Sequence, residues 1–491
     1  MARAGPHRLS KSRFLTGCKC HGLLWLMVHE PEAPELQPDE PLLDRFEQGR
    51  QVGEVARTRF PDGVLIDLPH NELEGRLAAT AAALACGAPA IFEASFMADG
   101  VFVAVDVLER ANGGFNLIEV KSSTSQEDKH IPDAAIQTHV LRRSGIDVVR
   151  VEIMHLNNEY RHPDVGDLFQ RTDVTPQVEQ LLPLLPDEID RQLSVINGPG
   201  PETVIGPRCF HSGDCPLVGR CWPDVSDHIR TLYNVGLKTA WKYMQAGVHT
   251  IWDIPPDRRL SATQRRQLRA LKEGTMIVEP GLAKALEPFS GRLGYLDFET
   301  VSRAIPVWPS LAPWGRVPAQ FSYHEESPDG SISHVGWLAE GPDDPRPALA
   351  EALVDACAGA DRIVTYTTFE RDCIRDLEAS VPDLAGPLRK IEAKLIDLPP
   401  VIRKNVYHPG FKGSFSIKNV LNPLVPELAY EDLAIDDGKV ASMEIARLLI
   451  AGDTMLPEER QRLRHDLLEY CKRDTWAMVM VVKKLRELAA S

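Results

Sequence analysis

The sequence predicts an α/β protein of several domains, and three observations support this expectation. The chain has 491 residues, which at roughly 100–200 residues per domain corresponds to two to four domains. Hydrophobic residues make up 43% and charged residues 25%, as in ordinary globular proteins. Segments with helical periodicity alternate with short apolar runs that are typical of strands, both in the first part of the chain and again after residue 292.

The charge balance excludes one class of protein. Lys and Arg total 55 and Asp and Glu total 70, so the formal net charge is −15. A chain this acidic does not coat nucleic acid nonspecifically, because the surplus carboxylates repel phosphate. Any contact with nucleic acid therefore requires a local basic patch, or metal ions held by some of the carboxylates.

The apolar runs are too short for a membrane anchor. The longest run near the N-terminus is Leu23–Val28, well below the ~18 residues that span a bilayer, and it lacks a signal-peptide cleavage site. We therefore expect a cytoplasmic protein with no membrane partner. In a reducing compartment the nine cysteines, an odd number, are not expected to form a disulfide framework.

Three regions follow one another along the chain, and we expect each to be a domain. Residues 1–225 and 292–491 both show α/β patterns, and the latter ends in a long predicted helix at about 457–488. Residues 226–291 read as a small helical domain. The segment 226–292 contains eleven Lys and Arg but six Asp and Glu, so it is locally positive by five charges in an acidic chain.

A predicted β-hairpin in the first region carries the first candidate site. The elements expected in this region are helices at 73–86 and 132–144 and strands at 101–109, 115–121 and 148–155. Two of the strands flank an Asn-Gly-Gly sequence, and Asn-Gly is a strong signal for a two-residue turn. With Asn112-Gly113 as the turn, Asp106 lies directly opposite Glu119. If the two glycines form the turn instead, this pairing shifts.

Facing carboxylates in this hairpin need a compensating charge. Like charges opposite each other destabilise a strand pair, and a divalent cation between Asp106 and Glu119 would offset the repulsion. Lys121 lies two residues after Glu119 on the same face, where its ammonium group could polarise a water molecule or hold a phosphate oxygen. The alternative interpretation is a solvated strand face with an ion pair.

The order of these residues resembles the PD-(D/E)XK nuclease core of the RecB type. In that family an Asp and a Glu hold the metal, a Lys supports the nucleophile, and a Gln-x-x-x-Tyr helix touches the DNA. The resemblance implies a restriction-endonuclease-like α/β core with the following residues: metal ligands Asp106 and Glu119, and catalytic Lys121 and Gln137. The sequence departs from the family at Leu141, which takes the tyrosine position, and at residues 46–60, which lack the family's histidine.

Cysteines form the second candidate site. Cys209, Cys215 and Cys221 are evenly spaced in a segment punctuated by Gly and Pro, and Cys20 lies far upstream. Four thiolates would complete a closed site for Zn²⁺ or a [4Fe–4S] cluster. Zinc sites usually contain close cysteine pairs, which this group lacks.

One remote cysteine before a nuclease core and three after it resemble the iron–sulfur nucleases of the AddB and CRISPR-adaptation type. The resemblance implies a structural [4Fe–4S] cluster held by Cys20, Cys209, Cys215 and Cys221. Cys18 and His211 are reserve ligands. Such a cluster would hold the two ends of the first domain together, because it joins segments that are far apart in the chain.

The basic segment carries a third motif. Residues 232–253 read as helix, glycine turn, helix and second glycine turn, which resembles a helix–hairpin–helix motif. In such motifs backbone N–H groups at the glycine turn bind a phosphate without regard to sequence. The resemblance implies nucleic-acid contacts at Gly236, Lys238 and Lys242. The alternative is a small helical linker.

The last region carries a second set of carboxylates. Asp297 and Glu299 share one face of a predicted strand that begins at residue 293, because side chains alternate along a strand. In the last helix Asp474 falls on an apolar stripe formed by Leu467, Cys471, Met478, Val481 and Leu485. A carboxylate on a core-facing stripe is costly unless it is paired or binds metal.

The order Asp-x-Glu, Phe-Glu, Tyr-x-x-x-Asp resembles the tyrosine subtype of the DEDD exonucleases, which have an RNase H-like fold. The resemblance implies two metal ions, Mg²⁺ or Mn²⁺, held by Asp297, Glu299, Glu370 and Asp474, with Tyr470 positioning the attacking water. The second motif departs from the family, since Tyr366 stands where Asn is common. Asp372 and Asp397 are therefore alternative third ligands.

Taken together, these motifs resemble a family of bacterial RecB-like nucleases with a C-terminal RNase H-like domain of unknown function. The strings at residues 9–14 and 296–300 carry that likeness best. The resemblance implies a nuclease, expected to be an exonuclease, that acts on single-stranded DNA or DNA ends. RNA processing is one alternative, and a non-catalytic iron–sulfur protein that binds nucleic acid or senses redox state is another.

Overall fold

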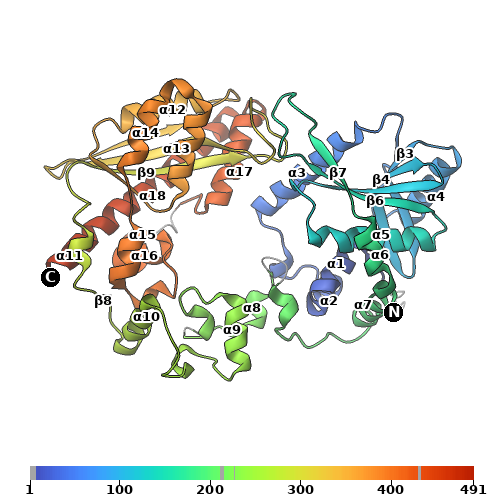
Figure 1. Ribbon diagram of the computed structural model, residues 1–491, viewed down its shortest axis with the longest axis horizontal. Helices are drawn as coiled ribbons and strands as arrows, with labels where there is room; N and C mark the ends of the chain where they lie inside the picture. The colour runs from blue at the N-terminus through green and yellow to red at the C-terminus, as the bar shows by residue number, and fades with distance from the viewer. Residues whose placement is uncertain (1–6, 211–214, 226, 429–432) are drawn as a thin grey trace. The chain divides into compact units, whose positions relative to one another are not determined.

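The computed structural model describes residues 7–210, 215–225, 227–428 and 433–491 (Figure 1). The chain divides into two compact units. Unit 1 consists of Met1–Pro223 and Arg303–Trp314, and unit 2 of Asp224–Ser302 and Gly315–Ser491. Among the described residues, no helix is both long enough and apolar enough to cross a membrane.

Unit 1 is built around a mixed sheet with the strand order β2-β3-β4-β5-β6-β7, and β1 pairs with β4. Its strands are β1 (Leu9–Ser10), β2 (Val64–Leu65), β3 (Ala90–Ala98), β4 (Val101–Ala111), β5 (Gly114–Lys121), β6 (Val148–Leu156) and β7 (Phe169–Asp173). Its α-helices are α1 (Lys11–Lys19), α2 (His21–His29), α3 (Glu40–Arg57), α4 (Leu73–Ala85), α5 (Ile131–Arg143), α6 (Thr175–Leu181), α7 (Leu185–Ile196) and α8 (Val218–Cys221). Its 3-10 turns are Pro34–Leu36, Asp128–His130, Leu182–Leu184 and Pro207–Phe210.

The β4–β5 hairpin has the register that an Asn112-Gly113 turn predicts. The antiparallel pairs run from Val107 opposite Ile118 to Ala111 opposite Gly114. The predicted register is thus confirmed over these pairs, and Asp106 and Glu119 are the next positions on the two strands, just beyond the paired residues. Gly113 has a φ of 86°, a left-handed conformation that glycine adopts without strain.

The N-terminal segment completes the edge of β4 that β5 leaves open. β5 pairs with β4 from Val107 onward, whereas β1 runs parallel to the start of β4, with Leu9 beside Val101 and Ser10 beside Phe102. α1 therefore begins near the carboxyl end of β5. Ser10 caps α1 by accepting a hydrogen bond from the Arg13 amide at 3.3 Å, which fixes where the helix starts.

The connection between β5 and the parallel strand β6 passes through α5, which is buried along most of its length. Its apolar side chains join the core of unit 1 together with residues of β3, β4 and β6. A continuous apolar run rather than a narrow amphipathic stripe is what a helix enclosed on several sides requires. Burial on this scale places Asp133 and Gln137, two of the polar residues of α5, inside the unit.

Unit 2 contains a five-stranded mixed sheet with the order β11-β10-β9-β12-β13, and a separate pair formed by β8 and β14. Its strands are β8 (Ile277–Val278), β9 (Leu293–Ser302), β10 (Arg316–Glu326), β11 (Ile332–Leu338), β12 (Arg362–Thr365), β13 (Leu395–Asp397) and β14 (Val406–Tyr407). Its α-helices are α9 (Gly236–Gln245), α10 (Ala262–Glu273), α11 (Leu282–Ala285), α12 (Arg346–Ala356), α13 (Phe369–Ser380), α14 (Ala385–Lys394), α15 (Pro399–Asn405), α16 (Ile417–Leu424), α17 (Gly438–Ile450) and α18 (Pro457–Ala490). Its 3-10 turns are Ile229–Thr231, Ile251–Asp253, Pro382–Leu384, Pro409–Phe411 and Gly452–Thr454.

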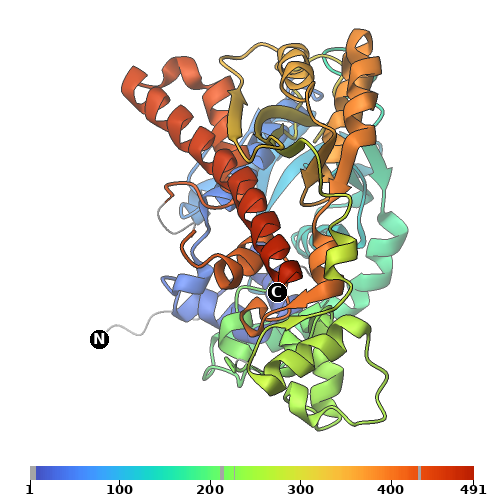
Figure 2. The same ribbon diagram turned by 90° about the vertical axis from the view of Figure 1, so that its left-hand side faces the viewer.

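The two faces of β9 meet different helices, as the alternation of its side chains predicts. Leu296 and Phe298 belong to the apolar core that β9 forms with α12, α13 and α14. The opposite face, which carries Asp297 and Glu299, packs against α17 and α18. Figure 1 shows α12 and α18 on opposite sides of β9, and Figure 2 shows α18 as the long red helix that ends at the C-terminus.

The basic segment differs from its prediction at one point. The helix expected before Gly236 is absent, and a single 3-10 turn, Ile229–Thr231, stands there. Only a few residues lie between this turn and Gly236, so there is no room for a helix. Asn234 also takes a left-handed φ of 56°, a conformation that interrupts a helix. The helix after Gly236 is present as α9. It is followed by Gly247, also at a positive φ, and then by α10.

The connection from β9 to β10, Arg303–Trp314, packs within unit 1, and no pattern in the sequence predicts this. Arg303 forms two hydrogen bonds with the Asp44 carboxylate of α3, at 2.8 and 2.9 Å. The Ala304 amide donates to Gln48 Oε1 at 2.8 Å, and Ala304 is fully buried. These contacts explain why a segment of residues 292–491, predicted as one domain, belongs to unit 1.

Candidate functional sites

Unit 1 gathers charged side chains where β1, β5 and α5 meet. Glu119 and Lys121 lie at the end of β5, and Gln137 comes from α5. The sequence motifs missed two residues of this cluster: Lys11, the first residue of α1, and Asp133, in the first turn of α5. Asp133 precedes Gln137 by one helical turn, and this spacing is the signal that could have identified it.

Glu119 lies at the centre of the cluster. Its Oε1 accepts hydrogen bonds from Lys11 Nζ at 2.8 Å and from Lys121 Nζ at 2.7 Å, and its Oε2 accepts one from Gln137 Nε2 at 2.7 Å. Asp133 shares these partners, since Lys121 Nζ lies 2.5 Å from Oδ2 and Gln137 Nε2 lies 3.0 Å from Oδ1. Two ammonium groups therefore neutralise two buried carboxylates, and the predicted residues Glu119, Lys121 and Gln137 lie together.

Asp106 lies beside this cluster, and its Oδ2 accepts a hydrogen bond from the Val120 amide at 2.7 Å. Burial and the Glu119 charge raise the pKa of Asp106 to about 7. Burial also opposes ionisation of Glu119, but Lys11 and Lys121 outweigh it and hold the pKa of that carboxyl well below its ordinary value. From the sequence we expected a divalent cation to offset the repulsion between these carboxylates. In this structure Lys11 and Lys121 supply the positive charge.

The predicted cysteines of unit 1 share one neighbourhood. Cys20, between α1 and α2, accepts a hydrogen bond from the Leu23 amide at 3.4 Å. Burial raises the pKa of the Cys221 thiol, and the nearby thiols of Cys20, Cys215 and Cys209 raise it further. Thiols are the donors that a zinc ion or a [4Fe–4S] cluster requires, so the chemistry of these residues is compatible with such a group. Among the described residues, the cysteines do not form a group of three donor atoms within 4.8 Å of one another.

Of the two reserve ligands, Cys18 lies among the described residues and His211 does not. The Cys18 thiol accepts a hydrogen bond from Gln192 at 3.6 Å, and burial together with the Glu188 charge raises its pKa to about 11. Its electrostatic partners are thus Glu188 and Gln192, whereas those of Cys215 and Cys221 include Cys20 and Cys209. His211 lies outside the described residues.

Unit 2 brings three of its predicted ligands together. Carboxylate oxygens of Asp297 and Glu299 on β9 and of Asp474 on α18 all lie within 4.8 Å of one another. The apolar stripe predicted for α18 is buried as expected, because it packs on the sheet; its members are Leu467, Cys471, Met478, Val481 and Leu485. Asp474 reaches the other two carboxylates because it lies on this sheet-facing stripe.

The electrostatics of this cluster favour a bound cation. Burial raises the pKa of Asp297 well above its ordinary value, and the neighbouring charges of Asp474, Glu299 and Glu370 raise it further. Burial and the Asp474 charge also raise the pKa of Glu299. Among the described residues, neither Asp297 nor Glu299 forms an ion pair. A metal ion would supply the missing positive charge.

Glu370 and Tyr470 border the cluster. Glu370, in the first turn of α13, is buried, and burial raises the pKa of its carboxyl to about 7. It is outside the group of three but close enough to raise the pKa of Asp297, which favours it over Asp372 and Asp397 as the third predicted acid. Burial and nearby carboxylates raise the pKa of the Tyr470 phenol, so its O–H remains a donor.

The N-terminus of α17 also borders this site, and the motifs missed it. A Cβ placed on Gly438 would lie 3.7 Å from the Tyr470 hydroxyl and 4.0 Å from Glu299 Oε2. Asp437 caps α17 by accepting a hydrogen bond from the Lys439 amide at 2.8 Å, and its charge contributes to the raised pKa of Glu299. An Asp before a helical glycine is a helix-start signal that could have drawn attention to this position.

The predicted nucleic-acid residues lie on α9. Gly236 opens the helix at a φ of 62°, and Lys238 and Lys242 are exposed one turn apart. Neither lysine forms an ion pair with a described residue. The two ammonium groups are thus presented to solvent on one side of the helix.

Part of the chain matches a known family model. The profile of a domain of unknown function, DUF2779, matches residues 294–416. The matched segment begins in β9 and ends before α16, so it includes Asp297, Glu299 and Glu370 but not Tyr470 or Asp474. No curated protein matches the chain.

Proposed function

We propose that the protein is a metal-dependent nuclease that hydrolyses phosphodiester bonds of DNA, with single strands or DNA ends as substrate. The observation that carries the proposal is the convergence of Asp297, Glu299 and Asp474 within 4.8 Å. Mg²⁺ or Mn²⁺ held there would stabilise charge on the phosphate and lower the pKa of a bound water. Glu370 would complete the ligand set.

A side chain of this site can orient the attacking water molecule. Tyr470 keeps its proton, so its hydroxyl can orient a water molecule toward a phosphate from beside Asp474 and Glu299. The apolar core on the far side of β9 keeps the strand rigid, which holds Asp297 and Glu299 in place. These features support an exonuclease of the DEDD class with an RNase H-like fold for residues 292–491.

The carboxylates of the two candidate sites have different partners. Glu119 and Asp133 in unit 1 already pair with Lys11 and Lys121, whereas Asp297 forms no ion pair among the described residues. A metal ion at Asp106 and Glu119 must compete with two ammonium groups for the same oxygens. We therefore assign the main activity to unit 2, and propose the restriction-endonuclease-like site of unit 1 as the weaker metal site.

The cysteine group supports a structural cofactor in the same proposal. Cys20, Cys209, Cys215 and Cys221 would hold a [4Fe–4S] cluster, which would tie the first and last segments of residues 1–225 together. The basic segment 226–291, with Gly236, Lys238 and Lys242, would contact the phosphates of the substrate strand.

The test compares matched variants of the full-length protein. Asp297→Asn and Asp106→Asn each remove one charge from one site, while Asp355→Asn on α12 and Asp190→Asn on α7 remove one exposed charge from the same units. Labelled single-stranded DNA, blunt duplex and RNA of the same sequence are incubated with Mg²⁺ or Mn²⁺, and the products are resolved on a denaturing gel. We expect Asp297→Asn to lower the rate by about 100-fold or more, because a metal ligand contributes several kcal/mol to the transition state.

The outcomes separate the alternatives. Loss of activity in Asp297→Asn, with Asp106→Asn and both controls near the wild-type rate, supports unit 2 as the main site. Faster cleavage of RNA than of DNA would make the protein an RNA-processing exonuclease. If the pure wild-type protein cleaves none of the substrates, or neither Asp297→Asn nor Asp106→Asn changes the rate, the nuclease proposal is wrong. A non-catalytic protein that binds nucleic acid or senses redox state would then be favoured.

A further inference from the structure

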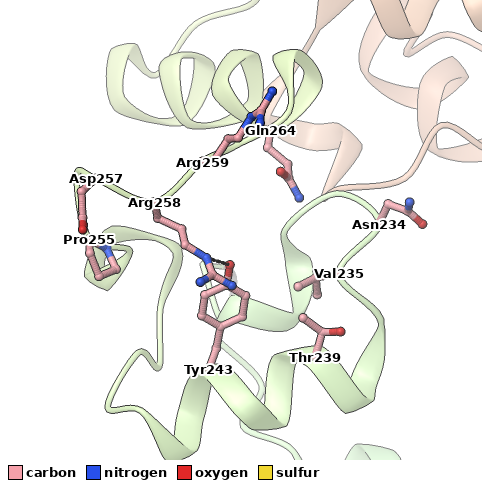
Figure 3. A pocket seen from close by; sticks show the side chains of 9 residues that line it. All are labelled: Asn234, Val235, Thr239, Tyr243, Pro255, Asp257, Arg258, Arg259 and Gln264. Carbon is pink, nitrogen blue, oxygen red and sulfur yellow. Dashed lines mark hydrogen bonds between the residues drawn. The ribbon is translucent and has the colours of Figure 1, made fainter.

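A pocket of about 600 Å³ lies in the basic segment, and it shares no lining residue with either carboxylate site. Figure 3 shows it between α9, the loop before α10 and the first turn of α10. Thr239 and Tyr243 line it from α9, Arg258 and Arg259 from the loop, and Gln264 from α10. Thr239 and Tyr243 fall within the stretch 232–253 that resembles a helix–hairpin–helix motif, but none of the five is one of the predicted contact residues Gly236, Lys238 and Lys242.

An aromatic ring and a guanidinium group form one wall of the pocket. Arg258 Nε donates a hydrogen bond to the Tyr243 hydroxyl at 3.1 Å, and its guanidinium carbon lies 5.2 Å from the centre of the Tyr243 ring. In Figure 3 the two side chains meet at the side of the pocket opposite Gln264. A planar cation held against an aromatic ring offers a stacking surface for a nucleobase and a donor for a phosphate.

The opposite wall is fixed by backbone contacts. Gln264 Nε2 donates to the Tyr233 carbonyl at 3.0 Å, and Gln264 Oε1 accepts from the Ser261 amide at 2.9 Å. Because both ends of this amide are bound, the wall does not need to rearrange when a ligand enters. A pocket whose walls are already held binds with a smaller loss of conformational entropy.

The charge around the pocket is positive. Arg259 forms no ion pair or hydrogen bond with the described residues, and the single acidic lining residue is Asp257. On α9, Thr239 and Tyr243 are one turn apart and face the pocket. Lys238 and Lys242 occupy the positions just before them, so they form a parallel row of cations about 100° around the helix. A polyanion leaving the pocket along α9 would therefore meet two further ammonium groups.

We infer that this pocket binds one nucleotide of a single-stranded nucleic acid, with its base against the Tyr243–Arg258 pair and its phosphate near Arg259. The inference rests on the proposed function for its choice of ligand, and it adds a binding site for the strand in the basic segment. Single strands fit because their bases are unstacked and can lie on a side-chain platform, whereas bases in a duplex remain stacked on one another.

The test measures binding separately from hydrolysis. Fluorescein-labelled oligothymidylate and oligouridylate are titrated with full-length protein in EDTA, and a blunt duplex serves as the comparison. Tyr243→Ala and Arg258→Ala are each expected to weaken single-strand binding by about tenfold, since loss of one stacking contact has effects of that size. Tyr243→Phe keeps the ring and is expected to bind within about threefold of wild type.

Two controls make the result specific. Lys284→Ala removes one exposed positive charge from the same basic segment outside the pocket, and it is expected to bind like the wild type. Thymidine monophosphate is expected to displace the oligonucleotide at lower concentration than inorganic phosphate does, because the pocket holds a base as well as a phosphate. Circular dichroism is used to check that Tyr243→Ala is folded. Arg258 is exposed, so Arg258→Ala tests the pocket without removing a ring.

Each outcome decides the inference. If Arg258→Ala and Tyr243→Ala bind as the wild type does, or if Lys284→Ala weakens binding as much as they do, the pocket is not the site. Equal displacement by inorganic phosphate and thymidine monophosphate would reduce the site to a phosphate site and overturn the role of the base. If the pocket variants lose binding while the wild type hydrolyses nothing, the proposed nuclease function fails and the pocket stands.

Discussion

Single carboxylates behave differently in the two units because their neighbours differ. Asp106 and Glu119 lie near each other, yet burial and Glu119 raise the pKa of Asp106 to about 7 while two lysines hold that of Glu119 low. In unit 2 burial and the neighbouring carboxylates raise the pKa values of both Asp297 and Glu299. The residue type alone therefore does not fix the ionisation of a carboxyl group, because burial and the charge of the surrounding groups shift its pKa.

Glu370 gives a prediction on pH. Its pKa is about 7 in the folded protein and about 4.3 when unfolded, so its neutral form stabilises the fold fully below about pH 4 and this contribution is lost as the pH rises through 7. We expect the melting temperature in EDTA to fall between about pH 5 and pH 8. The free energy of unfolding of Glu370→Gln should decrease by roughly 3 kcal/mol less than that of the wild type over the same pH range. Scanning calorimetry across this range measures it.

The control for this prediction is Glu351→Gln, an exposed acid on α12, which should follow the wild-type profile. Mn²⁺ should restore the melting temperature at about pH 8 more than at pH 5, because the metal binds ionised carboxylates. A Glu370→Gln protein whose melting temperature changes with pH as the wild type does would contradict the assigned burial of Glu370.

At the scale of elements, α1 connects two sites of unit 1. Lys11 at its first position contacts Glu119 and Asp133, and Cys20 follows its last residue, Lys19. The position of this helix depends on the cap at Ser10 and on the pairing of β1 with β4. Lys11 and Cys20 are thus attached to opposite ends of the same helix.

The cysteine group predicts a stability effect. In the proposed function a cluster at these cysteines cross-links distant parts of unit 1, so Cys215→Ser should remove that cross-link; closing a loop this long contributes on the order of 4–5 kcal/mol. We expect the melting transition of unit 1 to fall by about 10 °C, together with loss of bound iron. Calorimetry and elemental analysis of anaerobically purified protein measure the two changes.

Cys86→Ser is the matched control, because Cys86 is exposed at the end of α4 and outside the cysteine group. It should keep the wild-type metal content and melting temperature. Zinc in place of iron would preserve the cross-link and reject the iron–sulfur assignment. Wild-type stability and metal content in Cys215→Ser would reject the site itself.

At the scale of the whole molecule, the charge of this acidic chain is unevenly distributed. The net charge is −15, but the segment 226–292 is positive. Its exposed cations include Lys238 and Lys242 on α9 and Arg258 and Arg259 beside the pocket. In the proposed function, repulsion from the rest of the surface would limit nonspecific binding, while these few groups would hold a strand.

This distribution predicts a shallow salt dependence. Each phosphate contact on a single strand contributes a slope of about −0.7 to log K against log salt, so four cationic contacts predict a slope of about −3. Anisotropy titrations of full-length protein in EDTA between about 50 and 300 mM salt measure the slope. Arg259→Ala should reduce its magnitude by about 0.7.

The expected result for Lys284→Ala is an unchanged slope, because its side chain lies outside the pocket. A much steeper slope would mean that many more cations contact the strand than the basic segment provides. A slope near zero would mean that the binding does not depend on phosphate contacts.

The sequence by itself determined the local features of this protein. Asn112-Gly113 set the hairpin register, alternation placed Asp297 and Glu299 on one face of β9, and helical periodicity placed Asp474 toward the sheet. These features depend on turn geometry and on the periods of strands and helices, which neighbouring residues dictate. The helix expected before Gly236 was wrong because periodicity cannot show where a left-handed residue such as Asn234 interrupts the chain.

Only the tertiary structure decided which distant residues meet. Lys11 reaches Glu119 because β1 fills the open edge of β4, and Asp133 joins them because α5 crosses from β5 to β6. The packing of Arg303–Trp314 within unit 1 is likewise a long-range contact. Such contacts arise from burial and charge pairing between segments far apart in the chain, and no local pattern encodes them.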